Sequence, residues 1–287
     1  MELKPSKLMF IPVLLFAASV GVLLMTYVDT GEFVLKDVDL KGGTLVTIST
    51  EDPIDIKLLE KEVDKEFGSG IVSGLKTPSG YGATIQVEHT ISLAQVMNLV
   101  RSLNIEPIDY SEQTIGPVLG NLFFEQVRNS LIIAFVMMSV VIFIIYRNPV
   151  SSLGIVLASL GNILATLAFA NVFGIELSFA SFAGMLMLIA FTVDTNIVLT
   201  SKVVAYGSDT FMVRYKKAFV TGATLTATIT ATMVIVLFLS SSKLLLNIAE
   251  ILVIGFITDL VYTWILNAGM LEMYFDRKNR RHGGYGK

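Results

Sequence analysis

The sequence of 287 residues contains no cysteine, only two histidines and a single tryptophan, and only 16% of its residues are charged. The missing cysteines exclude disulfide frameworks, thiolate metal sites and cysteine nucleophiles. The two histidines, His89 and His282, lie outside every apolar run, which excludes a histidine metal site inside a membrane. Soluble domains are about 25% charged. The chain therefore lacks the polar surface of an ordinary cytosolic enzyme or of a disordered protein.

Motifs for nucleotide binding and hydrolysis are also missing. Gly68-Ser69-Gly70 does not complete a dinucleotide-binding fingerprint, because Ser73 stands where the third glycine belongs. The sequence holds no Walker loop, no nucleophile elbow and no HExxH motif. Its formal net charge of −3 leaves no diffuse basic footprint for nucleic acid. We therefore expect no cofactor, no metal, no nucleic-acid partner and no enzymatic activity, and an energy source that is an ion gradient or a partner protein.

Long apolar runs are what the sequence has in excess, since 53% of its residues are hydrophobic and its mean hydropathy is +0.70. A helix that crosses a bilayer needs about 20 mostly apolar residues. Six segments qualify: Leu8–Val28, Ser130–Tyr146, Ser151–Val172, Ser178–Leu199, Phe219–Leu239 and Asn247–Gly269. The first run is longer than the roughly 7–15 apolar residues of a signal peptide. We therefore expect a retained anchor helix followed by five further membrane helices.

The basic residues predict the orientation of these helices. With the N-terminus inside, 12 of the 21 Lys and Arg residues fall on the cytoplasmic side. The long connection after the first helix, residues 29–128, holds 16 acidic and 8 basic residues, a net charge of −8. We therefore expect a multi-pass protein in the lipid bilayer of the cell membrane, with both termini in the cytoplasm and residues 29–128 outside.

The connection is long enough to form a domain of its own. Its patterns predict strand, helix, strand, strand, helix and strand over Phe33–Thr50, Ile54–Phe67, Ile71–Lys76, Ala83–Glu88, Ser92–Leu103 and Glu106–Thr114. A Gly-rich turn, Ser79-Gly80-Tyr81-Gly82, joins the middle strands. This order predicts a ferredoxin-like α+β domain. The chain then divides into an anchor helix (1–28), the external domain (29–128), a five-helix membrane domain (129–272) and a basic cytoplasmic tail (273–287).

Two carboxyl groups are predicted at membrane depth, where an ionised side chain costs about 2.5–3.5 kcal/mol. Asp194 lies in the fourth apolar segment and Asp259 in the sixth, and no Lys or Arg lies at the same depth. Loss of water without a compensating cation favours the neutral acid, so either group is suited to binding and releasing a proton. The simpler alternative, a neutral acid that only hydrogen-bonds between helices, stays open.

Small and polar residues accompany these aspartates. In the third segment they recur at every fourth position, at Gly154, Ala158, Asn162, Thr166 and Ala170, a stripe that lets another helix approach closely. In the fifth segment Thr224 and Thr228 share one face. Threonine hydroxyls can bond to carbonyls of their own helix, so they are tolerated in lipid. We expect ordinary helix packing for Asn162, Thr224 and Thr228.

Three short motifs resemble those of the SecF family, the smaller membrane subunits of the SecDF accessory complex of protein export. The segment from Asp39 to Thr44, with Gly42 and Gly43, is similar to the D-x-x-G-G-T motif. The segment from Gly116 through Pro117 to Gly120 resembles the V-G-P-x-x-G motif, and Asp194-Thr195-Asn196-Ile197-Val198 lies within a segment similar to the D-T-x-x-V motif. The following Thr200-Ser201-Lys202 is closer to archaeal members.

This resemblance implies a membrane fold of the resistance-nodulation-division type, half of a twelve-helix unit that a SecD-like subunit completes. It also implies an accessory role in moving or releasing translocating polypeptides beyond a SecY-type translocon. In family members that use the proton gradient, the carboxyl group that corresponds to Asp194 belongs to the proton path. We therefore take Asp194, Thr195, Asn196 and Asp259 as proton-relay candidates. The glycine-containing motif residues Asp39, Gly42, Gly43, Thr44, Gly116, Pro117 and Gly120 are expected to be structural.

Two other classes of protein are alternatives. Two aspartates on two membrane helices could form the dyad of an intramembrane aspartyl protease. The G-x-G-D motif of such proteases is absent, because Phe256-Ile257-Thr258 precedes Asp259. A stand-alone exporter of lipids or drugs in the same superfamily would contain both six-helix halves in one chain, and 287 residues are too few for that.

Overall fold

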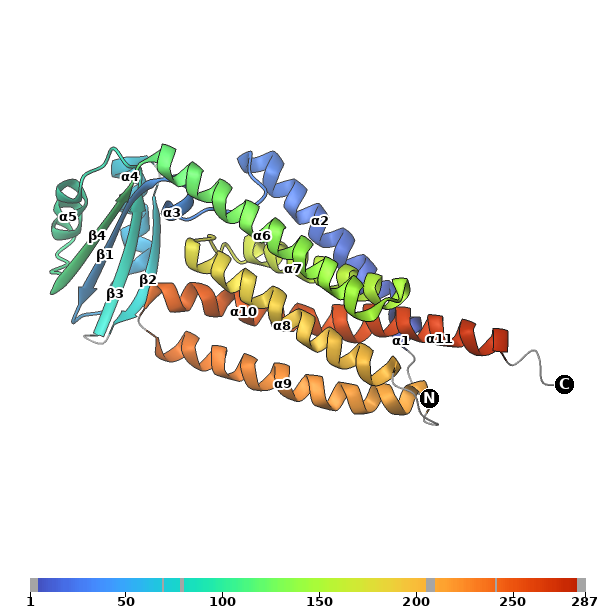
Figure 1. The fold of residues 1–287 in the computed structure, drawn as a ribbon. Helices are drawn as coiled ribbons and strands as arrows, with labels where there is room; N and C mark the ends of the chain where they lie inside the picture. Colours follow the sequence, from blue (N-terminus) through green and yellow to red (C-terminus); the bar gives the residue numbers. More distant parts are fainter. Residues whose placement is uncertain (1–4, 69, 78–79, 205–209, 241, 283–287) are drawn as a thin grey trace.

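The computed structural model describes residues 5–68, 70–77, 80–204, 210–240 and 242–282, and it combines a bundle of long helices with a small sheet (Figure 1). Six helical segments are long and apolar enough to cross a membrane. They are α1 (Pro5–Leu8) with α2 (Phe10–Thr30), α6 (Pro117–Tyr146), α7 (Pro149–Val172), α8 (Phe179–Val204), α9 (Phe211–Leu239), and α10 (Lys243–Val261) continued by the π-helix η1 (Tyr262–Asn267) and by α11 (Ala268–His282). The prediction of six spans is confirmed, and the chain is a multi-pass membrane protein.

The second span begins earlier than predicted. The predicted span starts at Ser130, but α6 begins at Pro117 and passes Arg128 without a break. Proline suits the first turn of a helix, because its missing N–H has no intrahelical partner there. The 30 residues of α6 extend about 45 Å, which exceeds the ~30 Å hydrocarbon core of a bilayer. The helix therefore reaches beyond the membrane as one continuous element.

The sheet domain consists of β1 (Gly43–Thr50), β2 (Ile71–Thr77), β3 (Gly80–Val87) and β4 (Asp109–Ile115), with α4 (Ile56–Phe67) and α5 (Leu93–Ser102) packed against the sheet. The strand order is β2-β3-β1-β4, and every neighbouring pair is antiparallel. Val46 of β1 is paired with Ile85 of β3 and with Glu112 of β4. The predicted succession of strands and helices is present, and the ferredoxin-like classification stays a prediction.

Two local predictions in this domain are wrong. Residues 33–42 do not begin the first strand, because Asp37 caps a short helix, α3 (Val38–Lys41), and β1 starts only at Gly43. The chain reverses between α3 and β1 at Gly42 and Gly43, whose φ angles of 82° and 147° favour glycine. The prediction of a turn over 79–82 is wrong for most of that range. Its residues 80–82 belong to β3, and Ser79 lies outside the described residues.

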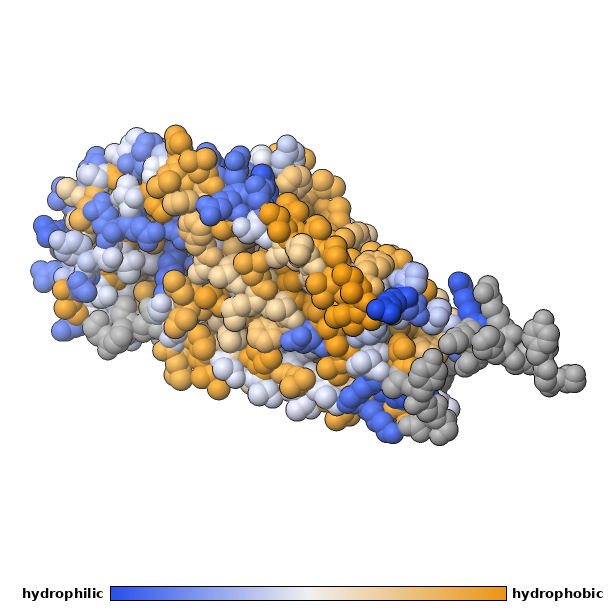
Figure 2. Space-filling model, in the orientation of Figure 1, coloured by the Kyte–Doolittle hydropathy of each residue, from blue (hydrophilic) through white to orange (hydrophobic). Residues whose placement is uncertain are grey.

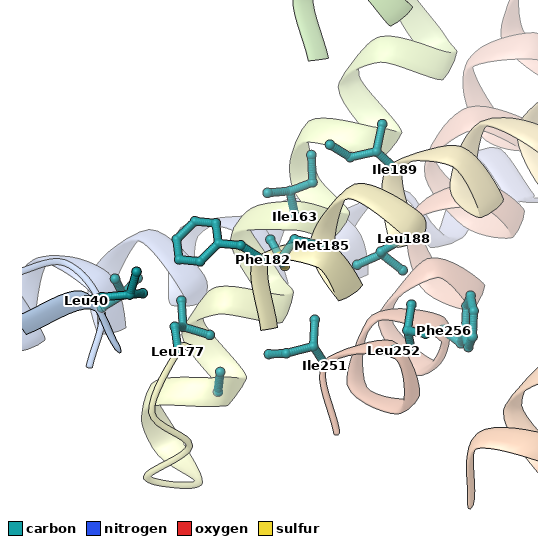
Figure 3. Close-up of a cluster of buried hydrophobic side chains, with 12 residues drawn as sticks. Leu40, Ile163, Leu177, Phe182, Met185, Leu188, Ile189, Ile251, Leu252 and Phe256 are labelled. Carbon is teal, nitrogen blue, oxygen red and sulfur yellow. The ribbon is translucent and has the colours of Figure 1, made fainter. Parts of the chain in front are cut away.

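The segment before α3 is attached to the loop between α7 and α8 by main-chain hydrogen bonds. The Asp37 N–H donates to the Leu177 carbonyl at 2.9 Å, and the Leu177 N–H donates to the Leu35 carbonyl at 2.8 Å. Leu40 of α3 and Leu177 also belong to one apolar cluster with side chains of α7, α8 and α10 (Figure 3). The sheet domain is thus joined to the bundle by this loop as well as by α6.

On the face shown in Figure 2, apolar side chains cover most of the bundle, while polar side chains gather at the sheet domain and at the opposite end. Helices α6 and α9 expose large apolar side chains, such as Ile133, Ile144, Val220 and Phe238. In contrast, α7, α8 and α10 bury much of their surface against one another. A continuous apolar exterior suits the hydrocarbon of a bilayer, and the packed helices α7, α8 and α10 hold the polar interior described next.

Candidate functional site

Asp259 of α10 is buried inside the bundle, with only 1% of its surface exposed. Its carboxyl group accepts hydrogen bonds from the hydroxyl groups of Thr195 and Thr263, and the Thr192 hydroxyl also faces it. Thr195 Oγ1 lies 2.9 Å from Oδ2, and Thr263 Oγ1 lies 2.8 Å from Oδ1. Within the described part of the chain, no Lys, Arg or His forms an ion pair or hydrogen bond with Asp259.

A chain of amide and hydroxyl groups leads from Asp259 toward the end of the bundle opposite the sheet domain. Asn196 Nδ2 donates to Thr263 Oγ1 at 2.8 Å. Asn267 Nδ2 donates to Asn196 Oδ1 at 2.7 Å and lies 3.4 Å from Thr200 Oγ1. All of these side chains are buried. Asp259 is therefore connected to groups one to two turns nearer that end.

A second polar cluster leads toward the sheet domain. Asn162 of α7 donates through Nδ2 to Thr192 Oγ1 of α8 at 2.8 Å, and its Oδ1 accepts a short hydrogen bond from Thr258 of α10. Thr166, one turn further along α7, lies 3.3 Å from the Thr258 hydroxyl. The carbonyl of Thr192 in turn accepts from Thr195 at 2.9 Å. Thr192 thus joins the two clusters, and together they form a polar seam from Thr166 to Thr200.

The seam depends on close contacts between η1 and small residues of its neighbours. A Cβ atom at Gly154 would lie 2.5 Å from Asn267 Oδ1, and one at Gly161 would collide with the ring of Tyr262. Gly154 belongs to the predicted small-residue stripe of α7, whose five members are all buried. π-Helical segments often mark functional sites. Here the η1 segment begins three residues after Asp259 and carries both Thr263 and Asn267.

Asp194 does not join this seam. Its side chain is exposed on α8, on one face with the exposed Ala190 and Ser201. The next residue, Thr195, is buried and contacts Asp259. No hydrogen bond joins the two carboxyl groups. The structure therefore brings together Thr195, Asn196 and Asp259 among the proton-relay candidates, and it leaves Asp194 on the surface of the bundle.

The three residues expected in helix packing have different surroundings. Asn162 lies between α7, α8 and α10. Thr224 and Thr228 are exposed on α9, where their hydroxyl groups donate to the Val220 and Thr224 carbonyls of the same helix, at 2.7 and 2.8 Å. Only Asn162 of these three therefore packs between helices of this chain.

The two glycine motifs pack against each other where the sheet domain meets the bundle. A Cβ atom at Gly120 would lie 2.6 Å from the Gly42 main-chain nitrogen, and one at Gly42 would lie 2.6 Å from Pro117 Cα. Gly116 caps α6 directly before Pro117. At the ends of the first motif, Asp39 accepts from Gln113 Nε2 at 2.8 Å, and the Thr44 hydroxyl lies 3.2 Å from that of Thr114. The two motifs therefore contact each other directly through their main chains, at Gly42 and at Pro117–Gly120.

Ion pairs surround this contact. Lys243 Nζ lies 2.9 Å from Asp37 Oδ2, and Lys41 Nζ lies 3.2 Å from Glu176 Oε1. Burial, with the nearby charge of Asp37 as a further cause, raises the pKa of Asp39 above its ordinary value. Burial likewise raises the pKa of Glu176, against the opposing effect of Lys41. Both carboxyl groups at the junction therefore hold their protons more tightly than free carboxyl groups do.

Sequence reasoning missed Thr192, Thr258, Asn267 and the π-helix. A signal for two of them was present, since Thr192 precedes Asn196 by four residues and Asn267 follows Asp259 by eight. Both spacings place side chains on the same helix face. As for ions, the described residues contain no cluster of three or more His, Asp or Glu side chains arranged to hold a metal.

Comparison with known proteins gives the family. The family model "Protein export membrane protein SecD/SecF, C-terminal" matches residues 95–277. SecF of Pyrococcus furiosus is 32% identical over 284 residues, which cover 96% of this chain and 93% of that protein. SecF of Methanocaldococcus jannaschii is 34% identical over 247 residues, which cover 83% of this chain and 86% of that protein.

The fold agrees with this match. The crystal structure of SecDF from Thermus thermophilus, a translocon-associated membrane protein, superimposes with a TM-score of 0.74 at 14% identity. The match covers 95% of this chain but only 38% of the SecDF chain. By its sequence matches and its fold, the chain belongs to the SecD/SecF family of protein-export membrane proteins.

Proposed function

We propose that the chain is a SecF-type subunit that works with a SecD-type subunit beside a SecY-type channel, and that it uses the proton gradient to assist the translocation or release of secreted polypeptides. Family membership and the relatives named SecF support the role in protein export. The match to about two fifths of a SecDF chain supports a SecD-type partner. In this proposal the sheet domain lies outside the cell and both termini lie in the cytoplasm.

The proton coupling is supported by one observation above all, the buried carboxyl group of Asp259 on the polar seam. Its two hydroxyl partners can satisfy either a carboxylate or a neutral acid, so protonation does not leave an unpaired polar group. Moving one charge through 100 mV releases about 2.3 kcal/mol. A proton that binds and leaves Asp259 could therefore favour one packing of α7, α8 and α10 over another.

The exposed position of Asp194 supports the proposal that a SecD-type subunit packs against this chain in the membrane. A carboxylate facing hydrocarbon is unfavourable by about 2.5–3.5 kcal/mol even on permissive scales. Asp194 shares its exposed face of α8 with Ala190 and Ser201, small residues that let another helix approach closely. We infer that a helix of the SecD-type subunit covers this face and supplies a hydrogen-bond donor to Asp194.

A continuous series of contacts connects α8 to the sheet domain. The loop before α8 is hydrogen-bonded to residues 35–37, which lead into α3, and α3 packs against the start of α6. A shift of α7 and α8 at the protonation site would therefore move the chain segments on both sides of the sheet domain. In the proposal this movement makes the domain hold or release an emerging polypeptide.

The experiment compares Asp259→Asn and Asp194→Asn with Asp276→Asn, which removes a carboxylate from the exposed surface of α11. Export of a secreted reporter is measured in cells, and assembly with the SecD-type subunit is checked by co-purification. We expect Asp259→Asn to assemble but to lose the stimulation of export, and Asp276→Asn to retain it. Full stimulation by Asp259→Asn would refute the proton role of this residue, while failure to co-purify a SecD-type chain with the unaltered protein would refute the proposed partner.

No observation favours either alternative function. The intramembrane protease requires two carboxyl groups that share a proton. Here Asp194 is exposed and Asp259 is buried against Thr195, and the two are not hydrogen-bonded. The stand-alone exporter is not favoured either, because the relatives of similar length are protein-export subunits.

A further inference from the structure

The two oxygens of the Asp259 carboxyl group are not equivalent. The asymmetry follows from counting donors and acceptors around Thr263. Asn196 Nδ2 donates to the Thr192 carbonyl and to Thr263 Oγ1, both at 2.8 Å. The Thr192 carbonyl can only accept, so this contact fixes which end of the Asn196 side chain carries the nitrogen. Thr263 therefore accepts from Asn196.

A threonine hydroxyl has a single proton to donate. Among the described residues, Asp259 Oδ1, at 2.8 Å, is the one acceptor within hydrogen-bond distance of the Thr263 hydroxyl, so its proton points there. This arrangement does not depend on the charge of Asp259. Oδ1 is therefore a hydrogen-bond acceptor in both protonation states, and it cannot carry a proton without displacing the one that Thr263 donates.

The Thr195 hydroxyl group, unlike that of Thr263, has more than one acceptor within reach. Three acceptors surround its hydroxyl group: Asp259 Oδ2 at 2.9 Å, the Thr192 carbonyl at 2.9 Å and the Phe191 carbonyl at 3.2 Å. Only one of them can receive the single proton at a time. When Asp259 is a carboxylate, charge favours the bond to Oδ2, because charge-assisted hydrogen bonds are the stronger ones.

We propose that Oδ2 of Asp259 is the atom that binds the proton, and that Thr195 is a positioning residue whose hydroxyl group reverses its hydrogen bond when the proton arrives. This inference rests on the proposed function, in which Asp259 binds and releases protons. On protonation, a new O–H bond forms at Oδ2 and donates to Thr195 Oγ1, while the Thr195 proton rotates to the Thr192 carbonyl. On release the rotation reverses, and no covalent bond of Thr195 breaks in either direction.

The reversal links the proton to helix α8. In both states a hydrogen bond joins Thr195 of α8 to Asp259 of α10, but in the neutral state it loses its charge assistance and the Thr195 proton bonds to the backbone of its own helix. The neighbouring residues Asp194 and Thr195 thus have different roles. Asp194 faces the outside of the bundle, while the hydrogen bond of Thr195 changes direction with the charge of Asp259.

Infrared spectroscopy of the full-length protein in lipid tests the assignment. The C=O stretch of protonated Asp259 is identified as the band that Asp259→Asn removes. Loss of a hydrogen bond to a C=O oxygen moves its stretch to higher wavenumber. We expect Thr263→Val to shift the band upward, because Oδ1 is the C=O oxygen, and Thr195→Val to shift it much less. Thr195→Ser and Thr263→Ser keep the hydroxyl groups and should restore the position seen in the unaltered protein.

Three results would overturn the assignment to Oδ2: a larger upward shift in Thr195→Val than in Thr263→Val, equal shifts in both, or no shift in either. A different failure would concern the proposed function itself. Spectra of the unaltered protein and of Asp259→Asn are compared from acidic to neutral pH. If every C=O band of the unaltered protein is also present in Asp259→Asn, Asp259 does not take up a proton. The two failures are therefore distinguishable in one data set.

Discussion

Asp194 and Thr195 are neighbours on α8, yet Asp194 is exposed on the outside of the bundle while Thr195 is buried and lies 2.9 Å from the carboxyl group of Asp259. A turn of about 100° per residue separates their directions. One short motif therefore places Asp194 on the face of α8 that we assign to a partner helix and Thr195 in the polar seam inside the bundle. The coupling between subunits that we propose depends on this division.

Gly120→Ala should loosen the contact between the sheet domain and the bundle. The new Cβ would lie 2.6 Å from the Gly42 nitrogen, a backbone atom that can move only with its chain segment. Overpacking of this kind costs about 1–3 kcal/mol. Thermal unfolding in detergent measures the loss. The control is Gly21→Ala on α2, where the added Cβ meets nothing within 4 Å. Equal midpoints for the two variants would contradict the backbone contact.

Lys243→Met should destabilise the junction by leaving Asp37 without its cation. The Asp37 side chain is only 4% exposed, and removal of one partner of a buried pair costs about 3 kcal/mol. Asp37→Asn combined with Lys243→Met should recover most of this loss, because no unpaired charge remains. Hydrogen exchange of residues 33–42 reports the effect. Lys65→Met, which breaks an exposed pair with Glu62, should change little. A double variant no better than Lys243→Met would refute the ion pair.

The attachment of the sheet domain should weaken as the pH rises. Burial raises the pKa of Asp39 and of Glu176, so the folded junction binds their protons more tightly than the unfolded chain does. The resulting stabilisation is fully present below the ordinary carboxyl pKa of about 4 and is lost as the pH rises through the raised values. Asp37, Lys41 and Lys243 are the charged groups that face these two carboxyls.

The check is the unfolding midpoint of the junction followed from about pH 4 to 7. We expect Glu176→Gln to flatten the dependence, because its neutral side chain has no proton to lose. Glu60→Gln, an exposed position on α4, should leave the slope unchanged. A junction that becomes more stable with rising pH would contradict the sign of both shifts.

The membrane helices were predictable because length and hydropathy alone define a span. The errors occurred where tertiary contacts decide. Residues 33–42 have the composition of a strand, but Asp37 caps α3 and Leu40 enters the bundle core instead of a sheet. The apolar run of the second span starts at Ser130, whereas α6 begins at Pro117, because the polar first turns of this 30-residue helix lie outside the apolar run.

The candidate site was predictable only in part. The cost of burying a charge singled out Asp194 and Asp259 but could not tell which of them faces inward. That distinction depends on helix rotation, which packing against α7 and α10 determines. The spacing of eight residues from Asp259 to Asn267 is visible in the sequence, but Asn267 makes its contact with Asn196 from a π-helix. No pattern in the sequence indicates that irregular turn.

The central claim is that Asp259 carries the proton that drives the export function. Proton flux into proteoliposomes that contain this chain and its SecD-type partner tests it most directly, with an imposed pH gradient and an enclosed pH-sensitive dye. We expect Asp259→Asn to abolish the flux and Asp276→Asn to leave it unchanged. Flux in Asp259→Asn at the rate of the unaltered complex would contradict the claim.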